Sequence, residues 1–196
     1  MSRVKVGILI SGRGSNMAAL IEAARAEDFP AEIALVVANK ADAVGLEKAR
    51  AVGVEGLALN AKAFADKTAF EAAIDAELRA RGVEIVCLAG YMRILGAPFV
   101  EKWRGRMLNI HPSLLPCYKG LRTHERALAE GAREHGCSVH LVTPELDDGP
   151  ILMQARVPVQ SGDDAEQLAA RVLVEEHRIY PEALALLARQ VISQRG

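Results

Sequence analysis

The sequence predicts an α/β protein with a single doubly wound, mostly parallel sheet, helices on both faces and an antiparallel portion near the C-terminal part. Apolar runs of strand length alternate with stretches of helical period along the chain, which is typical of such sheets. The run "VEIVCLAG" is continuously apolar, as expected of a strand buried on both faces. A chain of 196 residues can bury one substantial core, so we expect one domain over residues 1–196.

The elements follow from the spacing of apolar residues. The first half of the chain predicts strands over 4–10, 31–39, 54–60 and 83–90, and helices over 16–26, 41–53 and 66–82. The second half predicts strands over 106–111, 137–143 and 151–159, a short helix over 125–132 and a long helix after Asp163. The last two strands are closely spaced, so we expect them to be antiparallel. Pro181 is expected to bend or divide the last helix.

The composition argues against nucleic acid and membranes as binding partners. The chain has 24 basic and 25 acidic side chains, so no basic field indicates nucleic acid. Its three cysteines lack a CxxC spacing and are predicted to be free thiols of a reducing compartment. No apolar stretch nears the roughly 18 residues of a membrane span, and the N-terminal apolar run ends without a cleavage signal. We expect a cytoplasmic monomer or weak homodimer that acts on small molecules, not on nucleic acid or membranes.

Ligands of doubly wound sheets bind beyond the carboxyl ends of the strands, and the segment "SGRGSN" lies at such an end. Free backbone N–H groups and the positive end of a helix dipole suit a phosphate there. The segment is not a dinucleotide fingerprint, because Met17 stands where the third glycine would be, and it is not a P-loop. The alternative is a tight turn with Ser15 or Asn16 as N-cap. The candidate phosphate-binding residues are Gly12, Arg13, Gly14, Ser15 and Asn16.

The segment "LNIHPSLLP" ends a strand with an amide and an imidazole. Residues two apart in an extended chain point to the same side, so Asn109 and His111 would project together and could both donate to one developing oxyanion. The alternative is a partly buried histidine satisfied by the backbone, with Asn109 in a turn. In "ELDDGP", either Asp147 or Asp148 could hold the imidazole, and the spacing does not choose between them.

The other histidines show no spacing typical of metal ligands. We therefore expect them to be structural or on the surface, and we expect no metal site. These residues are His124, His135, His140 and His177.

Six segments together resemble one known family. They are "LISGRGSN", "ANKADAVGLEKA", "LAGYMRIL", "LNIHPSLLPCYKGLRTHERAL", "HGCSVHLVTPELDDGPILMQ" and "EEHRIYP". In order and spacing they are similar to the folate-dependent phosphoribosylglycinamide formyltransferases, over nearly the whole chain. The resemblance implies the formyltransferase fold and 10-formyltetrahydrofolate as co-substrate, without a metal.

The resemblance also implies a role for particular residues. The catalytic set would be Asn109, His111 and Asp147. The substrate phosphate would lie on the backbone of 12–16, and Glu176 would reach the ribose or glycinamide end. The folate would contact the following residues: Lys67, Met92, Arg93, Ile94, Leu95, Asn109, Leu141 and Val142.

The chain departs from the family pattern at three positions. Lys67 stands where some relatives carry an arginine, so a bidentate contact is lost. Asp148 replaces Gly or Ala, and Leu173 replaces a polar residue. We also expect residues 117–123 to be mobile, because a glycine lies there between a proline break and a helix.

The implied activity is transfer of a formyl group to the amine of glycinamide ribonucleotide, with proton transfer through His111 or a water. Two alternatives remain. The family's 10-formyltetrahydrofolate hydrolases carry an added N-terminal regulatory domain, whereas the motifs here begin at the start of the chain, so we expect a transferase. Relatives that act on transfer RNA carry an additional C-terminal domain. A non-catalytic phosphate-binding module would keep "SGRGSN" without needing Asn109, His111 and Asp147 together.

Overall fold

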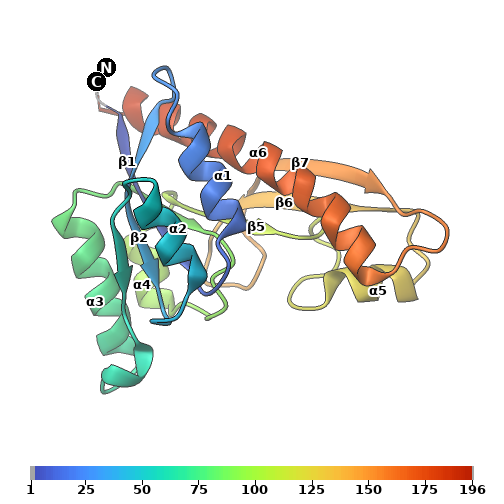
Figure 1. Cartoon of the computed structure of the whole chain (residues 1–196), viewed down its shortest axis with the longest axis horizontal. Helices are drawn as coiled ribbons and strands as arrows, with labels where there is room; N and C mark the ends of the chain where they lie inside the picture. Colours follow the sequence, from blue (N-terminus) through green and yellow to red (C-terminus); the bar gives the residue numbers. More distant parts are fainter. Residues whose placement is uncertain (1–2, 196) are drawn as a thin grey trace.

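A computed structural model describes residues 3–195. Its strands form one seven-stranded sheet (Figure 1). The strands lie in the order β3-β2-β1-β4-β5-β6-β7. Those from β3 to β5 are parallel, and β6 and β7 continue the sheet in antiparallel register. The strands are β1 Val4–Ile10, β2 Ala31–Ala38, β3 Gly56–Ala58, β4 Ile85–Leu88, β5 Met107–His111, β6 Glu134–Leu141 and β7 Ile151–Pro158. The predicted fold class and the antiparallel pair are confirmed.

Helices cover both faces of the sheet (Figure 1). One face packs under α1, α2 and α6 around a core that includes Leu20, Leu46 and Leu184. The opposite face packs under α3 and α4 around a second core that includes Phe70 and Phe99. The helices are α1 Ser15–Ala23, α2 Val44–Ala51, α3 Lys67–Ala80, α4 Ala97–Lys102, α5 Thr123–Ala129 and α6 Ala165–Ser193, with a 3-10 turn at Ala61–Ala63. None of the helices between residues 3 and 195 is long and apolar enough to cross a membrane.

Several element boundaries differ from the expectation. The short helix begins at Thr123 and not at 125, and β6 begins at Glu134 and not at 137. Helix α4 was not predicted, because six residues are too few to show a helical period. The N-cap of α1 is Gly14, in the left-handed region with φ 67°, and no side chain caps the helix. The alternative interpretation, in which Ser15 or Asn16 caps this helix, is therefore wrong in its choice of cap.

Of the two outcomes expected at Pro181, a bend or a division of the last helix, the division is wrong, because α6 runs through Pro181 as one element. A proline inside a helix removes one backbone hydrogen bond at a cost of about 3 kcal/mol or more. Here Pro181 lies in a buried stretch, and its neighbour Tyr180 is fully buried. The Tyr180 hydroxyl donates to the carbonyl of Leu88 at 2.9 Å and contacts that of Leu108 at 3.2 Å. This packing against the ends of β4 and β5 offsets the lost bond.

The order of the strands determines where a ligand binds. From β1 the chain moves outward through β2 and β3, and it then returns to add β4 and β5 on the other side of β1. The connections that follow β1 and β4 therefore leave the sheet in opposite directions. A crevice opens at such a switch point, beyond the carboxyl ends of the strands.

Candidate active site

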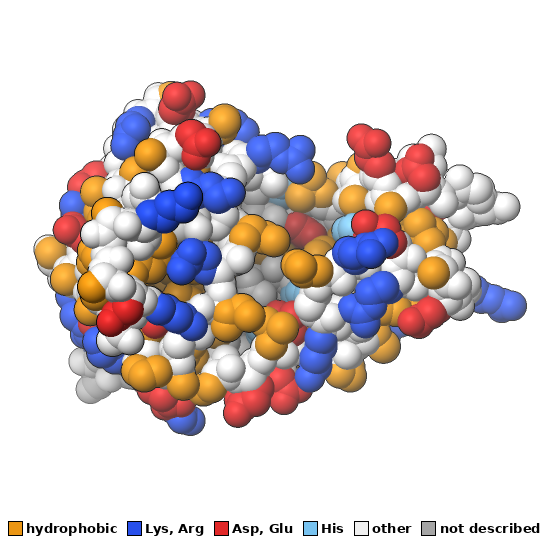
Figure 2. Space-filling view, turned by 90° about the horizontal axis from the view of Figure 1, so that it is seen from below, with side chains coloured by type: hydrophobic (Ala, Val, Ile, Leu, Met, Phe, Trp, Pro, Cys, Tyr) orange, Lys and Arg blue, Asp and Glu red, His pale blue; other side chains and the backbone are white. Residues whose placement is uncertain are grey.

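A cavity of about 760 Å³ lies at this end of the sheet. It brings together loops that are far apart in sequence, after β1, β4, β5 and β6. The space-filling view is hollowed in its middle, with hydrophobic and basic side chains around the opening (Figure 2). The predicted residues on its wall are Asn16, Met92, Arg93, Ile94, Leu95, Asn109, His111, Val142, Asp147 and Glu176.

Strand β5 presents Asn109 and His111 to the cavity, as the two-residue spacing predicted. His111 is 6% exposed. Its Nδ1 lies 3.5 Å from Oδ2 of Asp147, whose side chain is 8% exposed. Asp147 has a left-handed backbone with φ 50°, a conformation that Asp tolerates better than most residues. The structure thus brings an amide, an imidazole and a carboxylate to one wall.

The two candidate carboxylates of "ELDDGP" point in different directions. Asp147 approaches His111, whereas the exposed Asp148 pairs with Lys119 across the loop. Asp147 also accepts a hydrogen bond from the backbone N–H of Gly120 at 2.9 Å. The geometry therefore favours Asp147 as the carboxylate that acts on the imidazole.

His140, which is expected from the sequence to be structural or on the surface, lies on the wall of the cavity. It is directly opposite Asn109 in the antiparallel register of β5 and β6, and it lines the cavity. Its Nδ1 is 2.9 Å from the carbonyl of Leu141, which can only accept, so Nδ1 carries a proton. Burial lowers the pKa of His140, opposed by the Leu141 carbonyl and by Asp147. The ring is therefore neutral, and its Nε2 accepts a hydrogen bond from Asn109 Nδ2 at 3.1 Å.

Part of the signal for His140 was present in the sequence. Alternation in "CSVHLVT" places Ser138 and His140 on the same face of a strand. Which residue they face depends on the register with β5, where Ser138 is opposite His111 and His140 opposite Asn109. That register depends on the long connection between the strands, which has no simple turn signal.

Residues 117–123 contact both His111 and Asp147. The carbonyl of Tyr118 is 2.9 Å from Nε2 of His111, so that nitrogen donates to it. The N–H of Gly120 from the same segment donates to Asp147. Ser113 holds the start of the segment, because its hydroxyl donates to the carbonyl of Cys117 at 2.6 Å. In this conformation, the backbone of 117–123 occupies groups that a substrate would use.

The predicted phosphate loop reaches the cavity only through Asn16. The N–H of Gly45 in α2 donates to the carbonyl of Gly12 at 3.0 Å, and Lys48 Nζ donates to that of Arg13 at 3.1 Å. A side chain at Gly45 would lie 2.5 Å from Ile10 Cδ1 and 3.0 Å from the Gly12 oxygen, so the close packing of α2 on the loop requires glycine there. The loop backbone is thus held in place beside the cavity mouth.

Asn16 and Glu176 form a buried polar pair on the cavity wall. The Asn16 Nδ2 donates to Glu176 Oε2 at 2.6 Å, from helices 160 residues apart in sequence. Burial raises the pKa of the Glu176 carboxyl, and the hydrogen bond from Asn16 opposes that shift. Asn16 Oδ1 is buried without a partner among the described residues. A ligand donor that reaches this oxygen would satisfy it.

The residues predicted to bind folate are partly brought together. Met92 and Ile94 are exposed at 68% and 69%, which is unusual for large apolar side chains and suits a ligand-covered wall. Lys67 and Leu141 do not line the cavity; Lys67 lies 3.8 Å from Glu71 on α3. Leu173, at the third departure from the family pattern, does not line it either.

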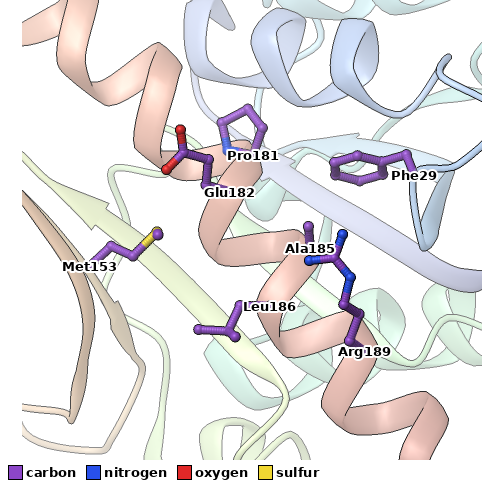
Figure 3. A pocket seen from close by; sticks show the side chains of 7 residues that line it. All are labelled: Phe29, Met153, Pro181, Glu182, Ala185, Leu186 and Arg189. Atoms are coloured by element: carbon purple, nitrogen blue, oxygen red, sulfur yellow. The ribbon is translucent and has the colours of Figure 1, made fainter.

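A second hollow of about 410 Å³ lies beside α6, between that helix, Met153 of β7 and Phe29, and it shares no lining residue with the larger cavity (Figure 3). Its wall is mostly apolar, with Glu182 and Arg189 as its charged side chains. It therefore lacks the convergent polar groups of the larger cavity. Among residues 3–195 no group of three or more His, Cys, Asp or Glu side chains could hold a metal ion.

The chain is similar to known proteins over most of its length. The chain is 46% identical over 185 residues to the phosphoribosylglycinamide formyltransferase of Escherichia coli, covering 94% of this chain and 87% of the relative. It is 47% identical over 186 residues, or 95% of its length, to the human trifunctional purine biosynthetic protein adenosine-3, of which it spans only 18%.

The chain is also similar to solved structures. The phosphoribosylglycinamide formyltransferase of Brucella melitensis superposes with a TM-score of 0.92 at 56% identity, over 95% of this chain and 96% of the other. The glycinamide ribonucleotide transformylase 1 of Symbiobacterium toebii superposes with a TM-score of 0.93 at 47% identity, over 96% and 89%. The family model described as formyl transferase matches residues 4–184, and the chain therefore belongs to the formyl transferase family.

Proposed function

We propose that this chain transfers the formyl group of 10-formyltetrahydrofolate to the amine of glycinamide ribonucleotide, in purine biosynthesis. The observation that carries the proposal is the convergence of Asn109, His111 and Asp147 on one wall of a cavity that has an apolar side and lies beside a loop suited to phosphate. The relatives named for this activity support it. We also propose that residues 1–196 act as one cytoplasmic domain, as a monomer or weak homodimer, without a metal.

The two substrates would approach from opposite sides of the catalytic set. The phosphate would lie on the backbone of Gly12–Asn16, where the N-terminus of α1 supplies N–H groups and a positive dipole end. Glu176 would hold the ribose or glycinamide end. The folate would lie along Met92–Leu95, with its pterin near the loop around Leu141 to Asp147, of which residues 142–147 line the cavity. Lys67, which does not line the cavity, would place its positive charge at the outer end of the folate.

The chemistry is a direct acyl transfer. The amine nitrogen attacks the formyl carbon, the carbonyl oxygen becomes an oxyanion, and the bond from that carbon to folate N10 then breaks as N10 gains the proton lost by the amine. One N–H of Asn109 is donated to His140, which leaves the other for the oxyanion. Asp147 attracts the positive charge that His111 acquires with a second proton. The proton passes through His111 or an ordered water.

The mechanism requires a movement of residues 117–123. In the structure described, Nε2 of His111 is occupied by the Tyr118 carbonyl at 2.9 Å. The N–H on that nitrogen reaches an oxyanion only after the carbonyl withdraws. This gives a function to the mobility that the sequence predicts for the segment.

The test is an assay of formyl transfer with the purified protein, 10-formyltetrahydrofolate, and glycinamide ribonucleotide present or omitted. A transferase releases tetrahydrofolate only when the amine is present. Release at the same rate without it would identify a hydrolase and reject the proposal.

Replacement of His111 by Ala separates an enzyme from a binding module. We expect turnover to fall by about 10² to 10⁴-fold while the thermal unfolding midpoint stays close to that of the parent. His177 lies on α6 outside the cavity wall, so His177→Ala is a matched control that should keep full turnover. Unchanged turnover in His111→Ala would contradict the mechanism.

A further inference from the structure

We propose that Ser11 is a positioning residue that couples the two substrate loops, so that a ligand on the phosphate loop strengthens binding on the folate loop and the reverse. The inference rests on the proposed function for the identity of the two ligands. It concerns a residue that the catalytic scheme does not use. Ser11 is the first residue after β1, and it is 5% exposed.

Ser11 makes two hydrogen bonds to the segment 90–96. Its backbone N–H donates to the carbonyl of Gly90 at 3.2 Å. Its side-chain Oγ accepts from the backbone N–H of Met92 at 2.8 Å. The strands β1 and β4 are adjacent and parallel, so their following loops start side by side. The hydroxyl adds a link beyond the sheet, where the ladder of the two strands has ended.

The same residue leads directly into the phosphate loop. The carbonyl of the next residue, Gly12, accepts a hydrogen bond from the N–H of Gly45 in α2. The loop then enters α1 at Ser15. A displacement of residues 12–16 by a bound phosphate therefore passes to Ser11 over one or two backbone bonds. From Ser11 it passes to Met92, the first residue of the folate wall. Because buried hydrogen bonds are costly to break, the loops are expected to shift as one unit.

A second tie holds the folate loop without reaching the phosphate loop. The N–H of Gly96 donates to Oε1 of Glu71 at 2.9 Å, and Glu71 lies on α3, on the opposite face of the sheet from α1. Glu71 is 7% exposed. Both ends of the 90–96 loop are therefore fixed, one by Ser11 and one by Glu71. Only the first of these ties connects it to the other substrate.

This difference gives a matched pair of variants. Ser11→Ala removes the hydroxyl but keeps the backbone bond to Gly90. Glu71→Ala loosens the folate loop from its other end. Ser11→Thr keeps a hydroxyl acceptor and should restore what Ser11→Ala loses. Each variant is first compared with the parent by thermal unfolding, so that loss of the fold is recognised.

The measurement is the dissociation constant of tetrahydrofolate, by calorimetry, with and without saturating glycinamide ribonucleotide. This pair of ligands binds without reacting because no formyl group is present. We expect the nucleotide to tighten folate binding at least about fivefold in the parent, a typical coupling between sites. The factor should fall to within about twofold of unity in Ser11→Ala and stay near the parental value in Glu71→Ala and Ser11→Thr.

Amide hydrogen exchange tests the link without ligands. Ser11→Ala should speed exchange about fivefold in peptides covering both 11–18 and 89–97, whereas Glu71→Ala should do so in 89–97 alone. Parental coupling in Ser11→Ala, no coupling in the parent, an equal loss in Glu71→Ala, or faster exchange confined to 89–97 would each overturn the proposal. If neither ligand binds the parent, the proposed function fails, and the exchange comparison still decides the link.

Discussion

His140 is expected to set the orientation of the Asn109 amide, and its replacement by Phe tests this directly. The ring shape is kept, but the acceptor at Nε2 is lost, together with the donor at Nδ1. Without the acceptor, the Asn109 amide is no longer held with one N–H directed into the cavity. We therefore expect formyl transfer to slow while the rest of the catalytic set stays in place.

The size of the effect follows from the single bond that is lost. A neutral hydrogen bond contributes about 1 to 1.5 kcal/mol, and about 1.4 kcal/mol corresponds to tenfold in a rate. Turnover in His140→Phe should thus fall about tenfold. This is less than the 10² to 10³-fold expected when a whole oxyanion donor is removed, as in Asn109→Ala. Loss of the Nδ1 bond to Leu141 should also lower stability by about 1 to 3 kcal/mol.

His140→Gln provides the contrast, because its side-chain oxygen can accept from Asn109 although it also loses the imidazole. The assay is steady-state formyl transfer at neutral pH, with thermal unfolding measured on the same samples. We expect kcat to be higher in His140→Gln than in His140→Phe. Parental kcat in a folded His140→Phe variant would refute the role assigned to His140.

Three further predictions follow from the geometry. In Gly149→Ala the new Cβ would lie 1.7 Å from the Leu141 oxygen, so the loop that carries Asp147 must move. We expect kcat to fall about 10²-fold or more, and the unfolding midpoint is measured on the same samples. In the folded protein the pKa of the Glu176 carboxyl is raised above 4.5, so this group loses its proton at a higher pH than in the unfolded chain. The folded protein therefore loses stability as the pH rises through that pKa. Glu176→Gln should therefore unfold at a higher temperature than the parent at pH 7 to 8, with the smallest difference below pH 4.5; an equal difference at all pH values would contradict this. Arg93→Met should raise KM for the folate about two- to fivefold with kcat unchanged, and Lys67→Met should have a smaller effect because Lys67 is not on the cavity wall; the reverse order would contradict the placement.

The fold was predictable because its signals are local. Continuous apolar runs mark the buried parallel strands, and the close spacing of β6 and β7 marks their antiparallel pairing. The expected division of the last helix at Pro181 was wrong for the opposite reason. Its cost is local, but the packing of Tyr180 and its neighbours that offsets it comes from the sheet, which the sequence around Pro181 does not show.

The candidate site was predictable in part, for the same reason. Asn109 and His111 are two residues apart in a strand, so their shared direction is a local property. The choice of Asp147 over Asp148 depends on the left-handed turn at φ 50° and on the N–H of Gly120, which is 27 residues away. The role of His140 depends on the register of two strands. Contacts of this kind require the tertiary structure.

The segment 117–123 is hydrogen-bonded both to the imidazole of His111 and to the carboxylate of Asp147. The Tyr118 carbonyl occupies His111 Nε2, and the Gly120 N–H occupies Oδ2 of Asp147, so one segment holds both catalytic groups. When the segment withdraws, both atoms are released in the same movement. Oδ2 of Asp147 lies 3.5 Å from Nδ1 of His111, so it would stay beside the ring while Nε2 becomes free to donate. The movement that the proposed mechanism requires would therefore free the imidazole donor and the carboxylate together, before the oxyanion forms.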